Sequence, residues 1–300
     1  MIFPKSLKKG STIGIVAPAG KIDAETIHFA EKFLQKRGYK VVLGANVTNT
    51  FHQYAGNDAH RKSDLQDMLD SKDIDAIFCA RGGYGTVRII DQLDFANYLK
   101  HPKWLVGYSD ITVLHAALNH KLGVASIHGP MPKNFPDKAD DEEDIELLFN
   151  LLHGELPDYT IKPCTYNRPG EAEGILMGGN LSLIYALRAT DLDPNPHGKI
   201  LFIEDLSEYL YHLDRMMQNL KLSGFLSQLG GLVVGDFTDM KDNDDPYGLN
   251  AYEVIKEAVA DYDYPLMFGF PAGHNHLNQP LVLGKKVTLR VSNTECQLTF

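Results

Sequence analysis

A chain of 300 residues is long for a single hydrophobic core, so we expect two domains or one domain with a large extension. Its 29 basic and 39 acidic residues give a formal charge of −10, which argues against binding to nucleic acid or to anionic membrane surfaces. Three widely spaced cysteines argue against a disulfide framework and favour a cytoplasmic protein. Neither a signal peptide nor a membrane span is expected, because no apolar run approaches about 20 residues.

The first half of the chain alternates between apolar runs and segments with helical spacing. The runs at 11–20, 39–47, 75–85, 104–110 and 124–130 predict strands, and the segments 24–38, 60–71, 86–100 and 111–123 predict helices. This alternation indicates a mostly parallel sheet flanked by helices. Ligands bind beyond the carboxyl ends of such strands, so the loops APAG, RGGYG and GYSD are expected at one edge.

The alternation breaks at residues 136–170, which are rich in proline and then in acidic residues. We interpret this segment as the crossing between an N-terminal domain (1–135) and a C-terminal domain (171–300). Its acidic run, 137–144, is expected to begin a helix because acids are favourable near a helix N-terminus. The remainder predicts a smaller α/β domain, with a hairpin near Asn293 that adds antiparallel strands.

The loop RGGYG, residues 81–85, is rich in glycine where a strand should pass into a helix. It lacks the lysine and the Ser/Thr of a P-loop, so a phosphate site is poorly supported. Gly82 and Gly83 could instead bring backbone N–H groups close to a developing oxyanion. A tight turn that needs positive φ explains the same glycines equally well.

Ser109 and Asp110 stand between an expected strand and an expected helix. Either residue could cap the helix, which is the common role of such side chains. The same position would present the Ser109 hydroxyl as a nucleophile, with the N–H of Asp110 beside it. Ile111 occupies the place of glycine in the G-x-S-x-G pattern, so the motif alone leaves both interpretations open.

Two segments of the second half carry further candidates. Glu204 and Asp205 end the apolar run ILFI, where a carboxylate could orient a histidine, although we expect Asp205 to cap the following helix. His274 and His276 lie in the loop GHNH, where a general base is favoured over a metal site because no third ligand has suitable spacing. Residues 239–248 fail as a calcium loop for lack of a correctly placed glycine.

Taken together, these segments resemble the LD-carboxypeptidases. The resemblance rests on IVAPAG, YAGNDAHRKSDLQDML, ARGGYG, GYSDIT, HGP, GGNLSLI, IED and GHNH, in that order from about residue 13 to 284. It implies a serine peptidase with Ser109 as nucleophile, Glu204 as orienting acid and His274 as general base. It also implies an oxyanion hole made by the N–H of Asp110 and that of Gly82 or Gly83. The role of His276 stays open, because relatives vary there.

The resemblance further implies a cytoplasmic homodimer that releases the terminal D-alanine of muropeptide tetrapeptides during peptidoglycan recycling, without metal or organic cofactor. Two alternatives remain. The microcin-immunity peptidases of the same superfamily would cleave peptidyl-nucleotides and should offer an aromatic side chain to a base. The single tryptophan, Trp104, lies in an expected buried strand, which disfavours this interpretation but leaves tyrosine or phenylalanine open for the role. The second alternative is an inactive protein that only binds a small ligand.

Overall fold

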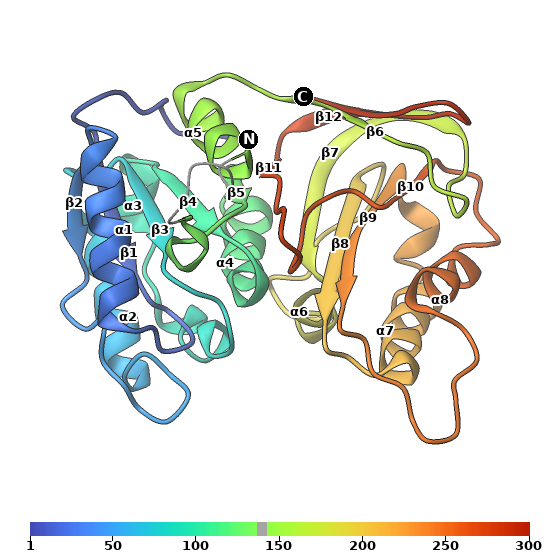
Figure 1. The fold of residues 1–300 in the computed structure, drawn as a ribbon, viewed down its shortest axis with the longest axis horizontal. Helices are drawn as coiled ribbons and strands as arrows, with labels where there is room; N and C mark the ends of the chain where they lie inside the picture. Colours follow the sequence, from blue (N-terminus) through green and yellow to red (C-terminus); the bar gives the residue numbers. More distant parts are fainter. Residues whose placement is uncertain (137–142) are drawn as a thin grey trace. The chain divides into compact units, whose positions relative to one another are not determined.

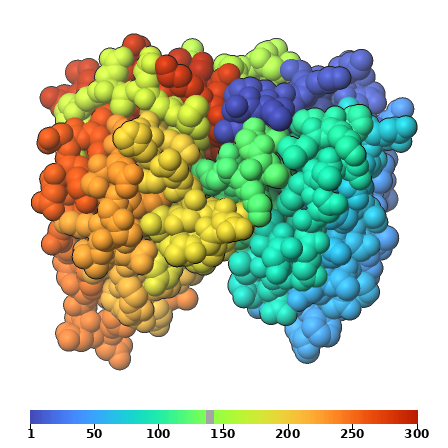
Figure 2. Space-filling model, turned by 180° about the vertical axis from the view of Figure 1, so that it is seen from behind, coloured from blue at the N-terminus to red at the C-terminus, as the bar shows by residue number. Residues whose placement is uncertain are grey.

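The computed structural model describes residues 1–136 and 143–300 and divides the chain into two compact units (Figure 1). Unit 1 comprises Met1–Glu155 and Gln279–Val282, and unit 2 comprises Leu156–Asn278 and Leu283–Phe300. Each unit contains one sheet and its helices, so the expected α/β class, with one parallel and one partly antiparallel sheet, is confirmed. In Figure 2 the blue-to-teal surface belongs to unit 1 and the yellow-to-orange surface to unit 2.

The sheet of unit 1 has the strand order β11-β5-β4-β3-β1-β2. Its strands are β1 (Thr12–Val16), β2 (Lys40–Leu43), β3 (Ala76–Cys79), β4 (Trp104–Gly107), β5 (Ser126–His128) and β11 (Leu281–Leu283). The pairings from β2 to β5 are all parallel, so the carboxyl ends of β1, β3 and β4 lie at one edge. Every residue of β3 and β4 is buried, which means that both faces of the sheet are covered. The loops APAG, RGGYG and GYSD therefore leave the sheet together, as expected.

The helices of unit 1 follow its strands. They are α1 (Ala24–Lys36), α2 (Asp58–Asp70), α3 (Ala96–Lys100), α4 (Thr112–Ala116) and α5 (Glu143–His153), and a π-helical turn, Ala117–Lys121, extends α4. Helix α1 is amphipathic, with Ile27, Ala30 and Leu34 on its buried face. The acidic run 137–144 lies outside the described residues except for its last two, which open α5.

The helix expected at 86–100 is broken into three short pieces. Two 3₁₀ turns, Thr86–Arg88 and Ile90–Gln92, precede α3. Asp94 accounts for the break before α3: its backbone N–H donates to the Gln66 side chain (2.9 Å), and its carboxylate accepts the N–H of Ala96 (2.8 Å). An aspartate that bonds to nearby backbone in this way ends one helix and starts another. The continuous helix was therefore wrong, because local hydrogen bonding overrides the apolar spacing.

Unit 2 contains a seven-stranded sheet in the order β10-β9-β8-β7-β12-β13-β6. Its strands are β6 (Asp158–Ile161), β7 (Gly170–Asn180), β8 (Ile200–Leu206), β9 (Gly231–Thr238), β10 (Leu266–Phe268), β12 (Lys286–Val291) and β13 (Cys296–Thr299). Strands β7 to β10 pair in parallel, whereas β12 pairs antiparallel with both β7 and β13. The expected hairpin is confirmed, since Val291 of β12 pairs with Cys296 of β13 around the turn.

Unit 2 contains three helices, α6 (Leu181–Ala186), α7 (Leu210–Leu222) and α8 (Ala251–Ala258), and α7 packs against both of the others. Their apolar faces join β7, β8 and β9 in one core that includes Leu213, Met217 and Ile255. The parallel half of the sheet carries Glu204 near the carboxyl end of β8. Over the two described stretches of chain, no helix has the length and apolar character needed to cross a bilayer.

Candidate active site

Ser109 lies two residues after β4 and is the first residue of a 3₁₀ turn (Ser109–Ile111) that leads into α4. Its φ of +64° is in the left-handed region, which a residue with a Cβ enters only when its surroundings require it. No side-chain hydrogen bond caps this turn, so Ser109 does not act as the helix cap. A serine on a strained turn between strand and helix has the geometry of a nucleophile elbow.

Gly82 packs directly against Ser109. A Cβ built on Gly82 would lie 2.8 Å from the Cβ of Ser109 and 3.0 Å from its Oγ, so only glycine fits there. The Gly82 carbonyl accepts the N–H of Gly20 (2.9 Å), which joins the loop RGGYG to the loop APAG. Among the described residues, the N–H groups of Gly82 and Gly83 donate to no partner. These two N–H donors therefore remain available beside Ser109. Gly83 has a φ of +108°, a backbone conformation that favours glycine.

Asp110 holds the loop RGGYG instead of capping the helix. Its buried carboxylate accepts the N–H of Thr86 at 2.8 Å, across 24 residues of sequence. Burial raises the pKa of the Asp110 carboxyl, while the hydrogen bonds from Thr86 and the charge of Arg61 act in the opposite direction. The expected capping role of Asp110 was wrong, since its side chain has this long-range partner. Its backbone N–H lies in the first turn of a helix, where N–H groups have no partner within the helix.

Arg61 is a functional candidate that the sequence reasoning missed. It projects from α2, is 1% exposed, donates to the carbonyl of Pro18 (2.6 Å) and forms an ion pair with Asp58. It also fills the space beside Gly85, where any Cβ would collide with the guanidinium. The sequence does contain a sign of this role. Arg61 lies four residues before Leu65 and therefore on the same, apolar face of α2, where a charged side chain needs buried partners.

A second hydrogen-bond network, which the sequence did not reveal, joins His115 of α4 to the end of β4. The Nε2 of His115 lies 2.8 Å from the carbonyl of Gly107, and its Nδ1 lies 2.8 Å from the hydroxyl of Ser126. A carbonyl only accepts, so Nε2 carries the hydrogen and Nδ1 accepts from Ser126, whose oxygen in turn accepts from Asn119 (3.1 Å). Burial lowers the pKa of His115 to about 4, which keeps the ring neutral. The network fixes the strand two residues before Ser109.

In unit 2, Glu204 and His274 form a hydrogen-bonded pair. The Nδ1 of His274 lies 2.7 Å from Oε2 of Glu204, whose side chain is fully buried. A register shift in the β8–β9 ladder lies between Ile203 and Asp205, at the position of Glu204. The loop that carries His274 is held by the N–H of Gly273, which donates to the side chain of Asn278 (3.1 Å). An ionised carboxylate can only accept, so Glu204 selects the tautomer with hydrogen on Nδ1 and leaves Nε2 as a base.

Asp205 caps a different helix from the one expected. Its carboxylate accepts hydrogen bonds from the side chain of Asn180 (2.8 Å) and the N–H of Ser182 (2.9 Å), at the start of α6. It therefore serves the helix after β7 and not α7, which follows it in sequence, so the expected cap was assigned to the wrong helix. Burial and the neighbouring Glu204 raise the pKa of Asp205 to about 7.

Asp236, near the end of β9, is a third carboxylate beside the pair, and no sequence motif marks it. Its N–H donates to the carbonyl of Ala272 (3.0 Å), and its side chain bonds to Asn275. A Cβ on Gly273 would lie 3.1 Å from the Cβ of Asp236 and 3.2 Å from that of Glu204, so glycine is needed there. Burial raises the pKa of Asp236 to about 6, and Glu204 adds to this effect.

The structure thus assembles the sequence candidates in two groups, each within its own unit. Ser109, Asp110, Gly82 and Gly83 lie together in unit 1, and Glu204 pairs with His274 in unit 2. His276 is exposed in the same loop as His274. In the described parts of the chain, no three His, Cys, Asp or Glu side chains are grouped closely enough to hold a metal ion.

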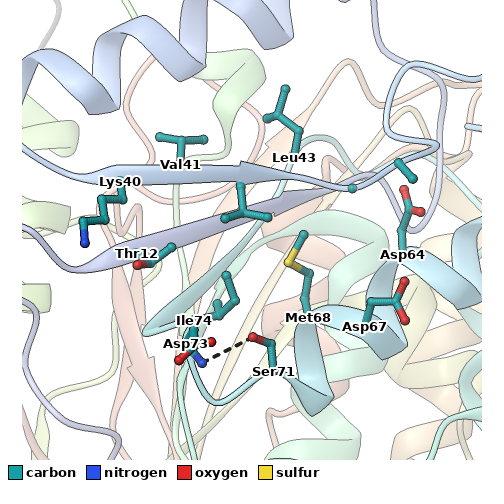
Figure 3. Close-up of a pocket in the computed structure, with 13 residues that line it drawn as sticks. Thr12, Lys40, Val41, Leu43, Asp64, Asp67, Met68, Ser71, Asp73 and Ile74 are labelled. Atoms are coloured by element: carbon teal, nitrogen blue, oxygen red, sulfur yellow. Dashed lines mark hydrogen bonds between the residues drawn. The ribbon is translucent and has the colours of Figure 1, made fainter.

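A cavity of about 680 Å³ in unit 1 contains none of these candidates. It lies against the edge strand β2, with Val41, Leu43 and Met68 among its apolar lining and Asp64 and Asp67 toward one end (Figure 3). Asp64 already accepts hydrogen bonds from Asn46, at 2.8 and 2.7 Å. The cavity is therefore separate from the loops that carry the candidate chemistry.

Comparison with known families gives two matches that together span most of the chain. Residues 13–129 match the model of the LD-carboxypeptidase N-terminal domain, and residues 173–289 match that of the C-terminal domain. A probable murein peptide carboxypeptidase of Bacillus subtilis (strain 168) is 36% identical over 292 residues, covering 96% of this chain and 92% of the relative.

One solved structure and one further relative complete the comparison. The crystal structure of muramoyltetrapeptide carboxypeptidase from Oxalobacter formigenes superimposes with a TM-score of 0.87 at 29% identity, covering 96% of this chain and 98% of that one. The microcin C7 self-immunity protein MccF of Escherichia coli is 26% identical over 328 residues, covering 98% of this chain and 94% of the relative. Solved structures of MccF align at TM-scores of 0.86–0.87 with 23–24% identity, which shows a shared fold alone.

Proposed function

This chain belongs to the LD-carboxypeptidase family of peptidases, and on that premise we propose that it is a serine carboxypeptidase that releases terminal D-alanine from muropeptide tetrapeptides. The bond cleaved is the amide between the L-centre of a diamino acid and the D-alanine. The product tripeptide would return to peptidoglycan synthesis. We propose further that the enzyme works in the cytoplasm as a homodimer.

The observation that carries the proposal is the buried pair of Glu204 and His274 in a chain that also presents Ser109 on a strained turn. A fully buried carboxylate held against a histidine has few structural explanations, because burying a charge is costly unless it is paired. In a peptidase, the same pair orients a general base and stabilises the imidazolium that forms.

The mechanism follows from these groups. The Nε2 of His274 takes the proton of the Ser109 hydroxyl as Oγ attacks the scissile carbonyl, and Glu204 stabilises the positive ring. The N–H of Asp110 and that of Gly82 or Gly83 donate to the oxyanion of the tetrahedral intermediate. His274 then protonates the departing amine of D-alanine, and water hydrolyses the acyl-enzyme by the same route. No step needs a metal or an organic cofactor.

A second candidate function is cleavage of a peptidyl-nucleotide. The observation in its favour is an exposed aromatic pair shortly after Glu204: the rings of Tyr209 and Tyr211 have centroids 5.5 Å apart, and each residue is 40% exposed. Exposed aromatic rings can stack on a nucleobase. Trp104 does not offer such a surface, because it is 6% exposed and its indole N–H donates to the carbonyl of Lys5.

One assay separates these functions. The purified protein is incubated with a muramyl tetrapeptide or with an aminoacyl sulfamoyl adenosine, and released D-alanine or nucleoside is measured. We expect D-alanine from the tetrapeptide and a reduction of at least a thousandfold in Ser109→Ala, since residual catalysis without the nucleophile is small. Equal turnover by wild type and Ser109→Ala would remove the serine mechanism. Preferential cleavage of the nucleotide substrate would favour the second function.

A further inference from the structure

We propose that Arg81 and Lys133 form the site that binds the terminal carboxylate of the peptide substrate, beside Ser109 in unit 1. The inference rests on the proposed function, because a carboxypeptidase has to select peptides by a free carboxylate at their end. It adds the residues that make this selection. The two residues come from different loops at the carboxyl edge of the sheet in unit 1.

Arg81 immediately precedes Gly82, the glycine that packs against Ser109. Its side chain lies over the loop APAG: a Cβ built on Gly20 would lie 3.6 Å from Arg81 Nε, and Nη1 donates to the carbonyl of Lys21 at 3.0 Å. A guanidinium has five donor hydrogens, and this bond uses one of them. The arginine is thus held by one contact and keeps donors for a ligand.

Lys133 reaches the same region from the 3₁₀ turn Pro132–Asn134, which follows β5. Its N–H donates to the carbonyl of Ala80 at 3.2 Å, the residue before Arg81. Its ammonium nitrogen lies 5.9 Å from the ring centroid of Tyr108, the residue before Ser109. The two cations therefore adjoin the two short segments that position the nucleophile.

The two side chains are neighbours of like charge. Desolvation of its ammonium group lowers the pKa of Lys133, although the residue as a whole is exposed, and the positive charge of Arg81 lowers it further. Over the described residues neither side chain takes part in an ion pair with a carboxylate. Lys133 also lines a hollow of about 370 Å³ together with Glu25, and no ion pair between the two is found among the described residues. Two neighbouring cations without an anion gain most from a ligand that brings one.

The chemistry of the substrate supplies such an anion at a suitable distance. In a peptide that loses its last residue, the terminal carboxylate lies only about one residue length, ~3.8 Å, beyond the scissile carbonyl. A carboxylate site must therefore adjoin the nucleophile, as Arg81 and Lys133 do. Arginine binds a carboxylate through two parallel N–H donors, and lysine adds a compact charge. An endopeptidase would have no use for this arrangement.

The test compares the tetrapeptide that ends in a free D-alanine carboxylate with the same peptide ending in a carboxamide. The wild type is expected to prefer the acid by roughly 10- to 100-fold in kcat/KM, the usual size of a charge-assisted contact. Arg81→Gln and Lys133→Gln should each lower kcat/KM for the acid and leave it almost unchanged for the amide. Arg81→Lys should restore part of the preference. Lys72→Gln, at an exposed lysine in the loop before β3, should behave as wild type.

The acid-to-amide ratio decides the result, because a merely structural role would lower both rates together. An unchanged ratio in Arg81→Gln and Lys133→Gln overturns the proposal, as does a wild type that hydrolyses acid and amide equally. Calorimetric titration of Ser109→Ala with both peptides gives a readout that needs no turnover. If the wild type hydrolyses neither peptide, the proposed function fails. Tighter binding of the acid by Ser109→Ala would then still support the carboxylate site, whereas equal binding or none overturns it.

Discussion

At the scale of the residue, Ser109 is held in a conformation that its neighbours have to enforce. A left-handed φ of +64° at a residue with a Cβ costs of the order of 1–3 kcal/mol. Asp110 offsets part of this cost by tying the turn to Thr86, and Gly82 leaves the space that the serine side chain occupies. The elbow is therefore a property of three segments packed together and not of the segment GYSDI alone.

Substituting Gly82 with alanine should abolish most activity while the protein remains folded. The added Cβ would lie 2.8 Å from the Cβ of Ser109, so either the serine or the loop has to move. A shift of this size near the reacting atoms typically costs about a hundredfold in rate. The measurement is kcat for D-alanine release together with the thermal unfolding midpoint.

The matched control is Gly123→Ala. Gly123 has a positive φ, +67°, which Gly82 lacks, and a Cβ at Gly123 meets nothing within 4 Å. We expect it to lose ~1 kcal/mol of stability from backbone strain and to keep wild-type kcat. Wild-type kcat in Gly82→Ala would mean that the glycine is needed only for the turn.

Glu204→Gln should lower kcat by roughly a thousandfold or more. Glutamine preserves the shape, but it can present an amide N–H to the ring, which favours the wrong tautomer of His274 and does not stabilise the imidazolium. Glu173→Gln is the control, because Glu173 pairs with Lys286 at the surface of unit 2 and exposed pairs contribute little. A kcat for Glu204→Gln within tenfold of wild type would contradict the assigned role.

At the scale of the element, the strands and the edge that carries the site could be predicted from the sequence. Buried runs such as AIFC and WLVG end in loops rich in glycine or polar residues, and parallel pairing then brings these ends to one edge. The interruption of the helix expected at 86–100 could not be predicted, because the N–H of Asp94 donates to Gln66 of the distant helix α2 and local apolar spacing does not show this contact.

The residues that were missed or misassigned share one physical cause. Asp110 binds Thr86, Asp205 binds Ser182, and Arg61 binds Pro18, all across more than twenty residues of sequence. A capping motif is local and gives no sign that a distant donor competes for the same carboxylate. The members of the proposed triad can be predicted from the family resemblance. The side chains that hold them in place can be identified only once the fold is known.

The network around His115 makes an element-scale prediction about pH. The pKa of His115 is lowered to about 4 in the folded protein, from a usual value near 6.5. Below pH 6.5 the unfolded chain binds a proton that the folded chain does not. The free energy of unfolding therefore contains the full contribution of the neutral His115 ring above pH 6.5. This contribution is lost as the pH falls from 6.5 toward 4, by up to about 3 kcal/mol.

His115→Gln should remove this loss. Glutamine can still bond to Gly107 and Ser126 but does not titrate, so its free energy of unfolding should fall less between pH 7 and pH 4 than that of the wild type. Denaturant unfolding at a series of pH values measures both curves. Parallel curves for the two proteins would show that His115 does not titrate as its burial implies.

At the scale of the whole molecule, the proposed triad divides between the two units: the nucleophile belongs to unit 1, and the base with its orienting acid belongs to unit 2. Each unit holds its own part with buried hydrogen bonds. The mechanism requires the two parts to meet in one site, and the homodimer that we propose offers two ways to arrange this.

We predict that the triad is completed within one chain. Mixing Ser109→Ala with His274→Ala under conditions that exchange subunits should then give no more activity than the two variants measured separately. If the serine of one chain instead used the histidine of its partner, half of the dimers would be mixed, each with one complete site, and about a quarter of wild-type activity would return. Sedimentation equilibrium establishes the dimer, and labelled subunits confirm the exchange. Recovery near a quarter would move the triad to the interface between chains, and it would make dimer dissociation a direct route to loss of activity.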